Sequence, residues 1–195
     1  MPKVNPYTHA LAGWCAAQAV CRHRRDVAIA AVGGVLADLD GAGLFIDVAT
    51  GHWNGPYRWY ESLHHVLGHN LLAAGATAVV AAFFARDRLR TGVVFFALFH
   101  LHLLMDLAGS GGPDGDLWTI SYLYPLSQRE FSWSGQWALN AWPNVVFTAA
   151  LLALFFRQTG RHGFSPFWYV SKRFDEEFVR TVRKWFAGKG GGTCM

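Results

Sequence analysis

The stretch YESLHHVLGHNLL, residues 60–72, places three histidines where a polar loop meets a long apolar segment. Imidazole is costly to bury without a partner and is the commonest neutral ligand for a divalent metal, so a cluster at such a junction predicts a metal site. His65 and His69 are four residues apart and would share one face of a helix. His64 would lie about 140° from His69 on the same helix, so it can join His69 only at or before the N-cap. Ser62 is the expected cap.

The composition of the whole chain indicates a membrane protein. Its 195 residues favour one domain, and they are 52% hydrophobic and 15% charged, compared with about 25% charged in an ordinary soluble domain. The apolar residues form blocks, and the 9 tryptophans and 15 phenylalanines suit rings that lie at a membrane interface. The three cysteines form no CxxC pair, so neither a disulfide framework nor a thiolate metal site is expected.

Hydrophobic periodicity and charged turns predict an all-α fold, a multi-helix membrane bundle of about four or five apolar helices with a C-terminal amphipathic helix. The apolar runs are about 12 to 16 residues, so flanking residues must extend them to the ~20 of a full span; the alternative is the core of a soluble bundle. The expected helices are 8–21, 27–36, 62–85, 92–108 and 145–156, and then the amphipathic helix 171–187. We expect a membrane-embedded metal-binding domain over 1–162, an amphipathic segment over 163–187 and a disordered tail over 188–195.

Basic turns predict how the bundle lies in the membrane. If successive helices run up and down, Arg22–Arg25, Arg86–Arg90 and Arg157–Arg161 all fall at one end. The positive-inside rule then predicts a multi-pass protein of the inner (cytoplasmic) membrane, with the histidines and aspartates toward the non-cytoplasmic face. Because these turns account for the basic charge, no nucleic-acid binding is expected. The basic amphipathic helix could lie on an anionic membrane surface or pack on its own domain, and both alternatives stay open.

Further metal-ligand candidates fall at the same end of the helices. His102 and Asp106 are four apart and share a helical face, although such a pair can also be a simple hydrogen bond. Asp38 and Asp40 would point the same way on extended backbone, although they can also cap neighbouring helices. Imidazoles mixed with carboxylates suit Zn²⁺ or Mn²⁺ better than Mg²⁺, and one or two ions are expected. The expected ligands are His9, Asp40, His64, His69, His102 and Asp106, with His65 as an additional candidate and Asp38 and Asp40 as catalytic acids.

These motifs resemble a known family, the membrane-bound metal-dependent hydrolases of the DUF457 type, also called LexA-regulated inner membrane hydrolases. Thr8, His9 and Gly13 match the first block of the family pattern. The second block, Pro-Asp-Leu-Asp, resembles residues 37–40, which have alanine in place of proline. The third block, His-Arg-x-x-Thr-His, resembles residues 64–69, which have histidine in place of arginine and glycine in place of threonine. The fourth block, His-x-x-x-Asp with a following glycine-containing loop, resembles residues 102–125. The resemblance covers roughly residues 5–127.

The resemblance implies an all-α membrane protein with a divalent metal site and hydrolase activity, distantly similar to the zinc-dependent phospholipase C and P1 nuclease group. The expected reaction is hydrolysis of a phosphoester of a membrane lipid or envelope metabolite by metal-activated water. Asp40 is expected to be a metal ligand, and Asp38 either a ligand or an acid that orients an imidazole. The alternatives are a non-catalytic metal-stabilised membrane scaffold or stress-response protein, and a soluble α-helical hydrolase. The sequence gives no oligomeric state.

Overall fold

The computed structural model describes residues 6–51, 59, 67–112 and 115–187, and most of these residues lie in helices. These residues hold seven α-helices and two 3-10 helices, and their only β structure is two isolated bridges. The elements are α1 (Pro6–Val20), α2 (Arg24–Val32), η1 (Leu36–Ala42), α3 (Gly43–Thr50), α5 (Leu71–Phe84), α6 (Arg88–Gly109), α7 (Trp142–His162), η3 (Pro166–Tyr169) and α8 (Lys172–Ala187). The predicted all-α fold is confirmed.

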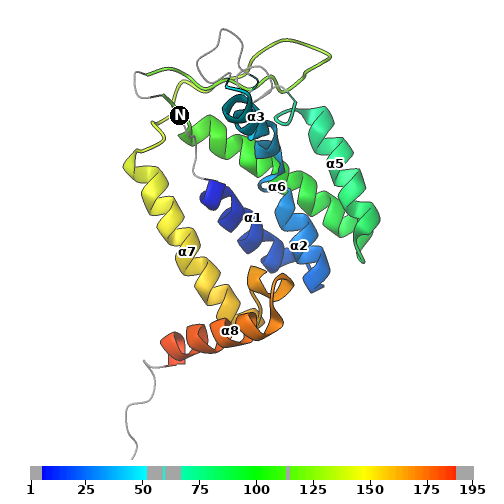
Figure 1. Ribbon diagram of the computed structural model, residues 1–195, viewed down its shortest axis with the longest axis vertical. Coiled ribbons are helices and arrows are strands. Elements are labelled where there is room, and N and C mark those ends of the chain that lie inside the picture. Colours follow the sequence, from blue (N-terminus) through cyan, green and yellow to red (C-terminus); the bar gives the residue numbers. More distant parts are fainter. Residues whose placement is uncertain (1–5, 52–58, 60–66, 113–114, 188–195) are drawn as a thin grey trace, which may run out of the picture.

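The bundle has two chemically different ends. Helix α1 packs against α2, α6 and α7, and α5 packs against α6 (Figure 1). The chain reverses at the lower end of Figure 1 between α1 and α2 and between α5 and α6, and α7 also ends there. These are the arginine-rich positions of the sequence. The starts of α1 and α5, the element η1 and the end of α6 lie at the upper end, and they carry the histidines and aspartates.

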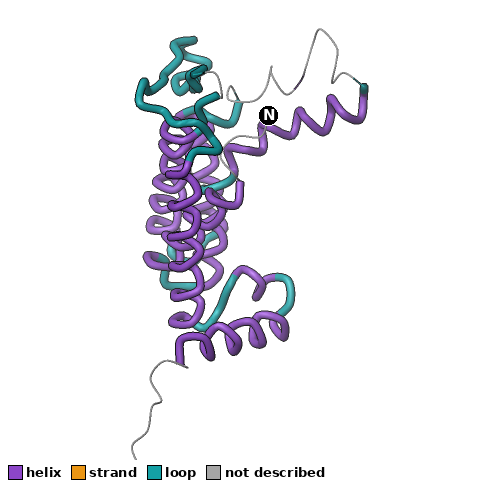
Figure 2. Tube along the Cα trace, turned by 90° about the vertical axis from the view of Figure 1, so that its left-hand side faces the viewer, coloured by secondary structure: helices purple, strands orange, loops and turns teal. Residues whose placement is uncertain are grey.

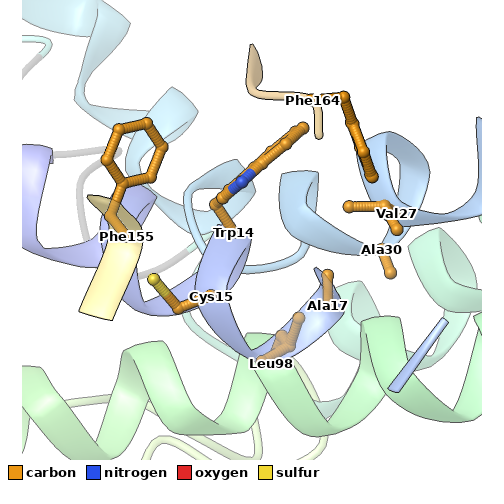
Figure 3. Packing of buried hydrophobic residues seen from close by; sticks show 8 residues of the cluster. All are labelled: Trp14, Cys15, Ala17, Val27, Ala30, Leu98, Phe155 and Phe164. Carbon is orange, nitrogen blue, oxygen red and sulfur yellow. The ribbon is translucent and has the colours of Figure 1, made fainter. Parts of the chain in front are cut away.

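Aromatic and small side chains fill the centre of the bundle. Trp14 and Cys15 of α1 pack with Leu98 of α6 and Phe155 of α7, and Phe164 closes this cluster from the segment before η3 (Figure 3). Burying side chains of this size contributes roughly 1.5–3 kcal/mol each. This packing fixes the lateral positions of the helices whose ends carry the candidate ligands.

A buried carboxylate joins two turns at the lower end. Asp26, near the start of α2, is 1% exposed and accepts hydrogen bonds from the backbone N–H groups of Arg86 at 2.8 Å and Asp87 at 3.0 Å. Asp87 in turn caps α6 by accepting from the backbone N–H of Arg90. Two backbone donors at the α5–α6 turn are thereby satisfied, and α2 is held against that turn.

Two glycines let α1 and the end of α2 approach closely. A Cβ atom on Gly13 would lie 2.8 Å from the carbonyl oxygen of Ala31, and a Cβ on Gly34 would lie 2.9 Å from the Cα of Gly13. Real Cβ atoms do not come this close, so the contact requires glycine at both positions. The same contact brings Gly34 beside His9, whose carbonyl oxygen would lie 3.1 Å from that Cβ.

Several predicted boundaries near the site are wrong. The third helix was expected from residue 62, but residues 67–70 are non-helical and α5 begins at Leu71. Asn70 is the cap, because its side chain accepts a hydrogen bond from the Ala73 N–H at 2.8 Å. The segment around Asp38 and Asp40 is the 3-10 helix η1, not extended backbone. Helix α3 (Gly43–Thr50) lies between the expected helices 27–36 and 62–85, where no helix was expected.

The described residues contain one helix that is long and apolar enough to cross a membrane, α6. The number is two if α2 and the segment Leu36–Thr50, bent by 51° relative to each other, count as one span. Helix α5 is apolar but shorter, at 14 residues. The structure therefore does not by itself establish a multi-pass membrane bundle.

Candidate metal centre

His102 is held by a backbone carbonyl so that one ring nitrogen faces the interior of the site. It lies on α6, is 1% exposed, and its Nδ1 is 2.9 Å from the carbonyl oxygen of Gly34. A carbonyl can only accept a hydrogen bond, so Nδ1 carries the proton and donates it. In the neutral ring, Nε2 then bears the lone pair. This is the arrangement in which proteins present imidazole to a metal.

His69 is held in the same way, by a carboxylate. Its Nδ1 lies 2.9 Å from Asp40 Oδ2, which also accepts the backbone N–H of Gly68 at 3.0 Å. The chain passes close to η1 here, because a Cβ on Gly68 would lie 2.4 Å from the carbonyl oxygen of Ala37 and 2.9 Å from Asp40 Oδ2. Glycine at position 68, a departure from the family pattern, is therefore what this approach requires. The Nε2 atom of His69 points toward His102.

Asp106 is the acid at the centre of the cluster. Its Oδ2 lies 3.1 Å from His102 Nε2 and 3.4 Å from His69 Nε2. Its Oδ1 lies 3.2 Å from His9 Nε2 and accepts a hydrogen bond from the Ser110 hydroxyl at 3.2 Å. One turn of α6 separates Asp106 from His102, so a single helix supplies both. His9, from the first turns of α1, lies over the His102 ring with 3.9 Å between centroids.

Asp38 completes the cluster on its outer side. Its Oδ1 lies 3.5 Å from His102 Nε2, and its side chain is 32% exposed, whereas the side chains of His69, His102 and Asp106 are at most 5% exposed. One ligand atom from each of Asp38, His69, His102 and Asp106 lies within 4.8 Å of the others. Three members of the cluster are therefore buried, and the cluster reaches solvent at Asp38.

The residues present fit a divalent cation. The two Nε2 atoms of His69 and His102 are 3.4 Å apart. If both are lone-pair acceptors, as their Nδ1 partners require, they repel one another unless a cation or a proton lies near them. Asp38 Oδ2 is buried and accepts no hydrogen bond within the described part of the chain, and Asp106 Oδ2 lies against the Nε2 atoms of His69 and His102, which carry no hydrogen while both rings are neutral. Buried acceptors without donors are unusual, and a cation between them would satisfy them.

Protons are the alternative counter-charge. Burial of the His69 imidazole lowers its pKa, but the hydrogen bonds to Asp106 and Asp40 and the charges of these carboxylates outweigh burial and raise the pKa to about 9. Without a cation, His69 is therefore protonated at neutral pH. A metal that takes this position must displace that proton.

All the candidate ligands in the described part of the chain lie together, and two further candidates lie outside it. His9, Asp38, Asp40, His69, His102 and Asp106 lie together at the upper end of the bundle. His64 and His65 lie outside the described residues, so the choice between them stays open. His100 lies away from the cluster, with its Nε2 2.9 Å from the Tyr122 hydroxyl.

Sequence reasoning missed three groups that position the ligands: the carbonyl of Gly34, the N–H of Gly68 and the hydroxyl of Ser110. The first two are backbone groups, which no residue type reveals. Ser110 could have been predicted from the sequence, because it is four residues after Asp106 and therefore lies on the same face of the helix. It is the C-cap of α6.

Comparison with known proteins places the chain in a family. A family model described as YdjM inner membrane protein matches residues 4–173, which include every described member of the cluster and end at the second residue of α8. No curated protein and no solved structure matches the chain. Since the match covers most of the sequence, the chain belongs to the YdjM inner membrane protein family, which is the DUF457-type family that its motifs resemble.

Proposed function

We propose that this protein is a metal-dependent hydrolase of the inner membrane that cleaves a phosphoester of a lipid or envelope metabolite. Its metal ligands are His69, His102, Asp106 and Asp38, and one or two Zn²⁺ or Mn²⁺ ions match this mixture of imidazoles and carboxylates. The observation that carries the proposal is the pair of imidazoles whose Nδ1 atoms are both fixed by acceptors, so that both Nε2 atoms face Asp106.

A divalent cation held there supplies Lewis acidity, which polarises an ester oxygen and lowers the pKa of water. The protein's own groups do the rest. Asp40 and the Gly34 carbonyl keep the two rings in one tautomer and orientation. Asp38 stands at the exposed edge, where the site is open to water and substrate. Asp106 carries charge that stays buried and is balanced from within the cluster.

The geometry favours a catalytic over a purely structural site. A structural ion is closed off by protein ligands, whereas a catalytic one keeps an accessible side. Here the side chain of Asp38 is 32% exposed while its three partners are almost fully buried, so the site is open at one edge. A non-catalytic metal-stabilised scaffold is the rival, and a hydrolysis assay separates it from the enzyme.

A multi-pass arrangement explains the apolar outer surface of the bundle. Val79 and Phe83 of α5 are 72% and 67% exposed, Val145 of α7 is 65% exposed and Leu104 of α6 is 61% exposed. Apolar surface this extensive is typical of contact with lipid rather than water. With the basic turns in the cytoplasm, the cluster faces the non-cytoplasmic side.

The test is metal analysis and hydrolysis by the detergent-purified protein, with generic phosphomonoesters and phosphodiesters as substrates. Wild type should retain Zn²⁺ or Mn²⁺ and hydrolyse at least one class, and His102→Ala should lose both properties. His100→Ala is the matched control, because His100 is on the same helix but bonds to Tyr122 outside the cluster. Metal retention without hydrolysis by wild type would favour the scaffold, and equal metal content in all three proteins would refute the site.

A further inference from the structure

A groove of about 480 Å³ lies between α7 and the last turns of α8, at the end of the bundle opposite the metal cluster. Ala150, Ala153 and Leu154 line it along one face of α7, and Trp185 and Phe186 line it from α8. These positions on α7 are three and four residues apart, so they form a continuous apolar stripe. The apolar lining of the groove suits a hydrocarbon chain.

A single charge ends this apolar stripe. Arg157 lies one turn beyond Ala153 on the same face, lines the groove and is exposed. It forms no ion pair with any residue that the structure describes, unlike Arg180, which pairs with Glu177 at 3.0 Å. From Ala150 to Arg157 the stripe extends about 10 Å along α7. An occupant with an apolar chain and an anionic head matches this order of side chains.

The aromatic side chains of α8 stand at the position where a membrane interface is expected. Figure 2 shows α8 lying across the lower end of the bundle rather than along its helices. Trp185 is 59% exposed, and its ring is held against Phe156 of α7 with 5.6 Å between centroids. Tryptophan prefers the headgroup level of a bilayer, so an α8 in this orientation lies in the plane of the membrane surface.

The surface around the groove is basic. Helix α8 carries exposed Arg173 and Lys184, which form no ion pair within the described residues. The acid Asp175 of the same helix is 1% exposed and is used internally, because it accepts hydrogen bonds from the backbone N–H and the hydroxyl of Ser165. Of the two other acids of α8, Glu177 pairs with Arg180 and Glu176 is exposed, so the five basic residues of this helix still outnumber its exposed acids. The lower end therefore attracts anions.

We propose that this groove binds one anionic phospholipid, with an acyl chain along the α7 stripe and its phosphate beside Arg157. The inference is independent of catalysis at the metal cluster. The family match covers the α7 wall of the groove and ends at residue 173, so the α8 wall, with Trp185 and Phe186, lies beyond it. The lipid would fasten α8 to α7 and anchor this end of the protein in an anionic leaflet.

The test is native mass spectrometry of the full-length protein in detergent, titrated with dioleoyl phosphatidylglycerol or dioleoyl phosphatidylcholine. One phosphatidylglycerol should bind more tightly than phosphatidylcholine. Arg157→Gln should weaken that binding about fivefold, the usual effect of one basic residue near an anionic headgroup. Ala153→Trp should fill the groove and remove the tight adduct.

Two matched variants control for charge and bulk. Arg22→Gln removes one exposed charge at the same end of the bundle, and Ala149→Trp adds the same bulk at an exposed α7 position that does not line the groove. Both should keep the tight phosphatidylglycerol adduct. Equal affinity for the two lipids in wild type, or equal losses in the variants and their controls, would overturn the proposal.

A second measurement covers the case in which Ala153→Trp fails to fold. In proteoliposomes, the fluorescence of Trp185 is obtained by subtracting the spectrum of Trp185→Phe from that of wild type. Brominated phosphatidylglycerol should quench this fluorescence more than brominated phosphatidylcholine does at the same mole fraction. If neither lipid quenched this fluorescence, Trp185 would lie away from the bilayer and the lipid site would be refuted.

Discussion

Asp40 touches both the ring of His69 and the backbone before it, and its role can be separated from that of Asp106 by one matched pair of variants. Asp40→Asn keeps an oxygen acceptor but loses the charge that orients the His69 ring. We expect metal affinity to fall about 10–100-fold, with full occupancy restored at high metal concentration. Asp106→Asn should bind no metal at the same concentrations. Titration against a competing chelator measures both.

The outcome also decides which of Asp38 and Asp40 is the metal ligand. The sequence predicts Asp40 as the direct ligand, whereas the geometry favours Asp38 as ligand and Asp40 as the acid that holds the ring. If Asp40→Asn behaved like Asp106→Asn, Asp40 would be a ligand after all.

The protonation of His69 predicts a pH-dependent metal affinity. Its pKa in the metal-free protein is raised from the ordinary 6.5 to about 9 by Asp106 and Asp40. The stabilisation from the charged ring is therefore complete below pH 6.5 and is lost as the pH rises through about 9. Metal must displace this proton, so affinity should increase up to about tenfold per pH unit and level off above about pH 9. Calorimetric titration in buffers of different ionisation enthalpy would count the proton released; release of none at neutral pH would contradict the assignment.

At the residue scale, residue type and position predicted which side chains lie together, but not the roles of the two aspartates. His9, His69, His102 and Asp106 were all predicted from residue type and from their shared end of the bundle, and the structure places them within contact of one another. The roles of Asp38 and Asp40 could not be predicted, because they depend on η1. A 3-10 turn between residues two apart sends their side chains in different directions, whereas extended backbone would align them.

At the scale of helices, the contact between Gly13 and Gly34 sets the distance between α1 and the Gly34 carbonyl that holds His102. Gly13→Ala should cost about 1–3 kcal/mol of stability, because an added methyl group must push the backbones apart. It should also lower metal affinity. Thermal unfolding in detergent and metal titration measure the two effects.

Gly75→Ala is the control for this prediction. Gly75 also lies inside a helix, α5, but nothing lies within 4 Å of an added Cβ. The substitution should therefore be neutral or stabilising by up to ~1 kcal/mol, the helix propensity difference between glycine and alanine. If both variants were equally stable, the close approach of α1 to α2 would not constrain the fold.

Helix cores could be predicted from periodicity, but helix starts near the site could not. The apolar pattern runs through residues 62–85 without a proline, so the earliest cap, Ser62, looked sufficient. The chain instead uses Asn70, since residues 67–70 bend to bring Gly68 and His69 against Asp40. Tertiary hydrogen bonds decided the boundary, and local propensity does not contain them.

At the scale of the whole molecule, the distribution of arginines predicts the side of the membrane on which the cluster lies. In a Cys194→Ser background, Ser134→Cys in the exposed loop at the cluster end should react with an impermeant maleimide in intact cells. Arg88→Cys, at the start of α6, should react only after the membrane is opened.

Cell-surface labelling followed by gel-shift detection gives the answer. The reverse pattern would place the cluster in the cytoplasm, and labelling of both positions in intact cells would exclude a membrane barrier between the two ends. The native cysteines give the background: Cys15 is buried and Cys21 is partly buried.

The four candidate ligands come from three separate segments of the chain, so a bound ion would act as a cross-link between distant parts of the sequence. It would tie the end of α6 to Asp38 of η1 and to His69, closing loops of about thirty residues, and the stability gained from such a closure grows with the length of the loop. The two ends of the protein would then open independently. Chelation should expose the loop between α6 and α7 to proteolysis, while the junction of α7 and α8, held by Asp175 and Ser165, stays protected.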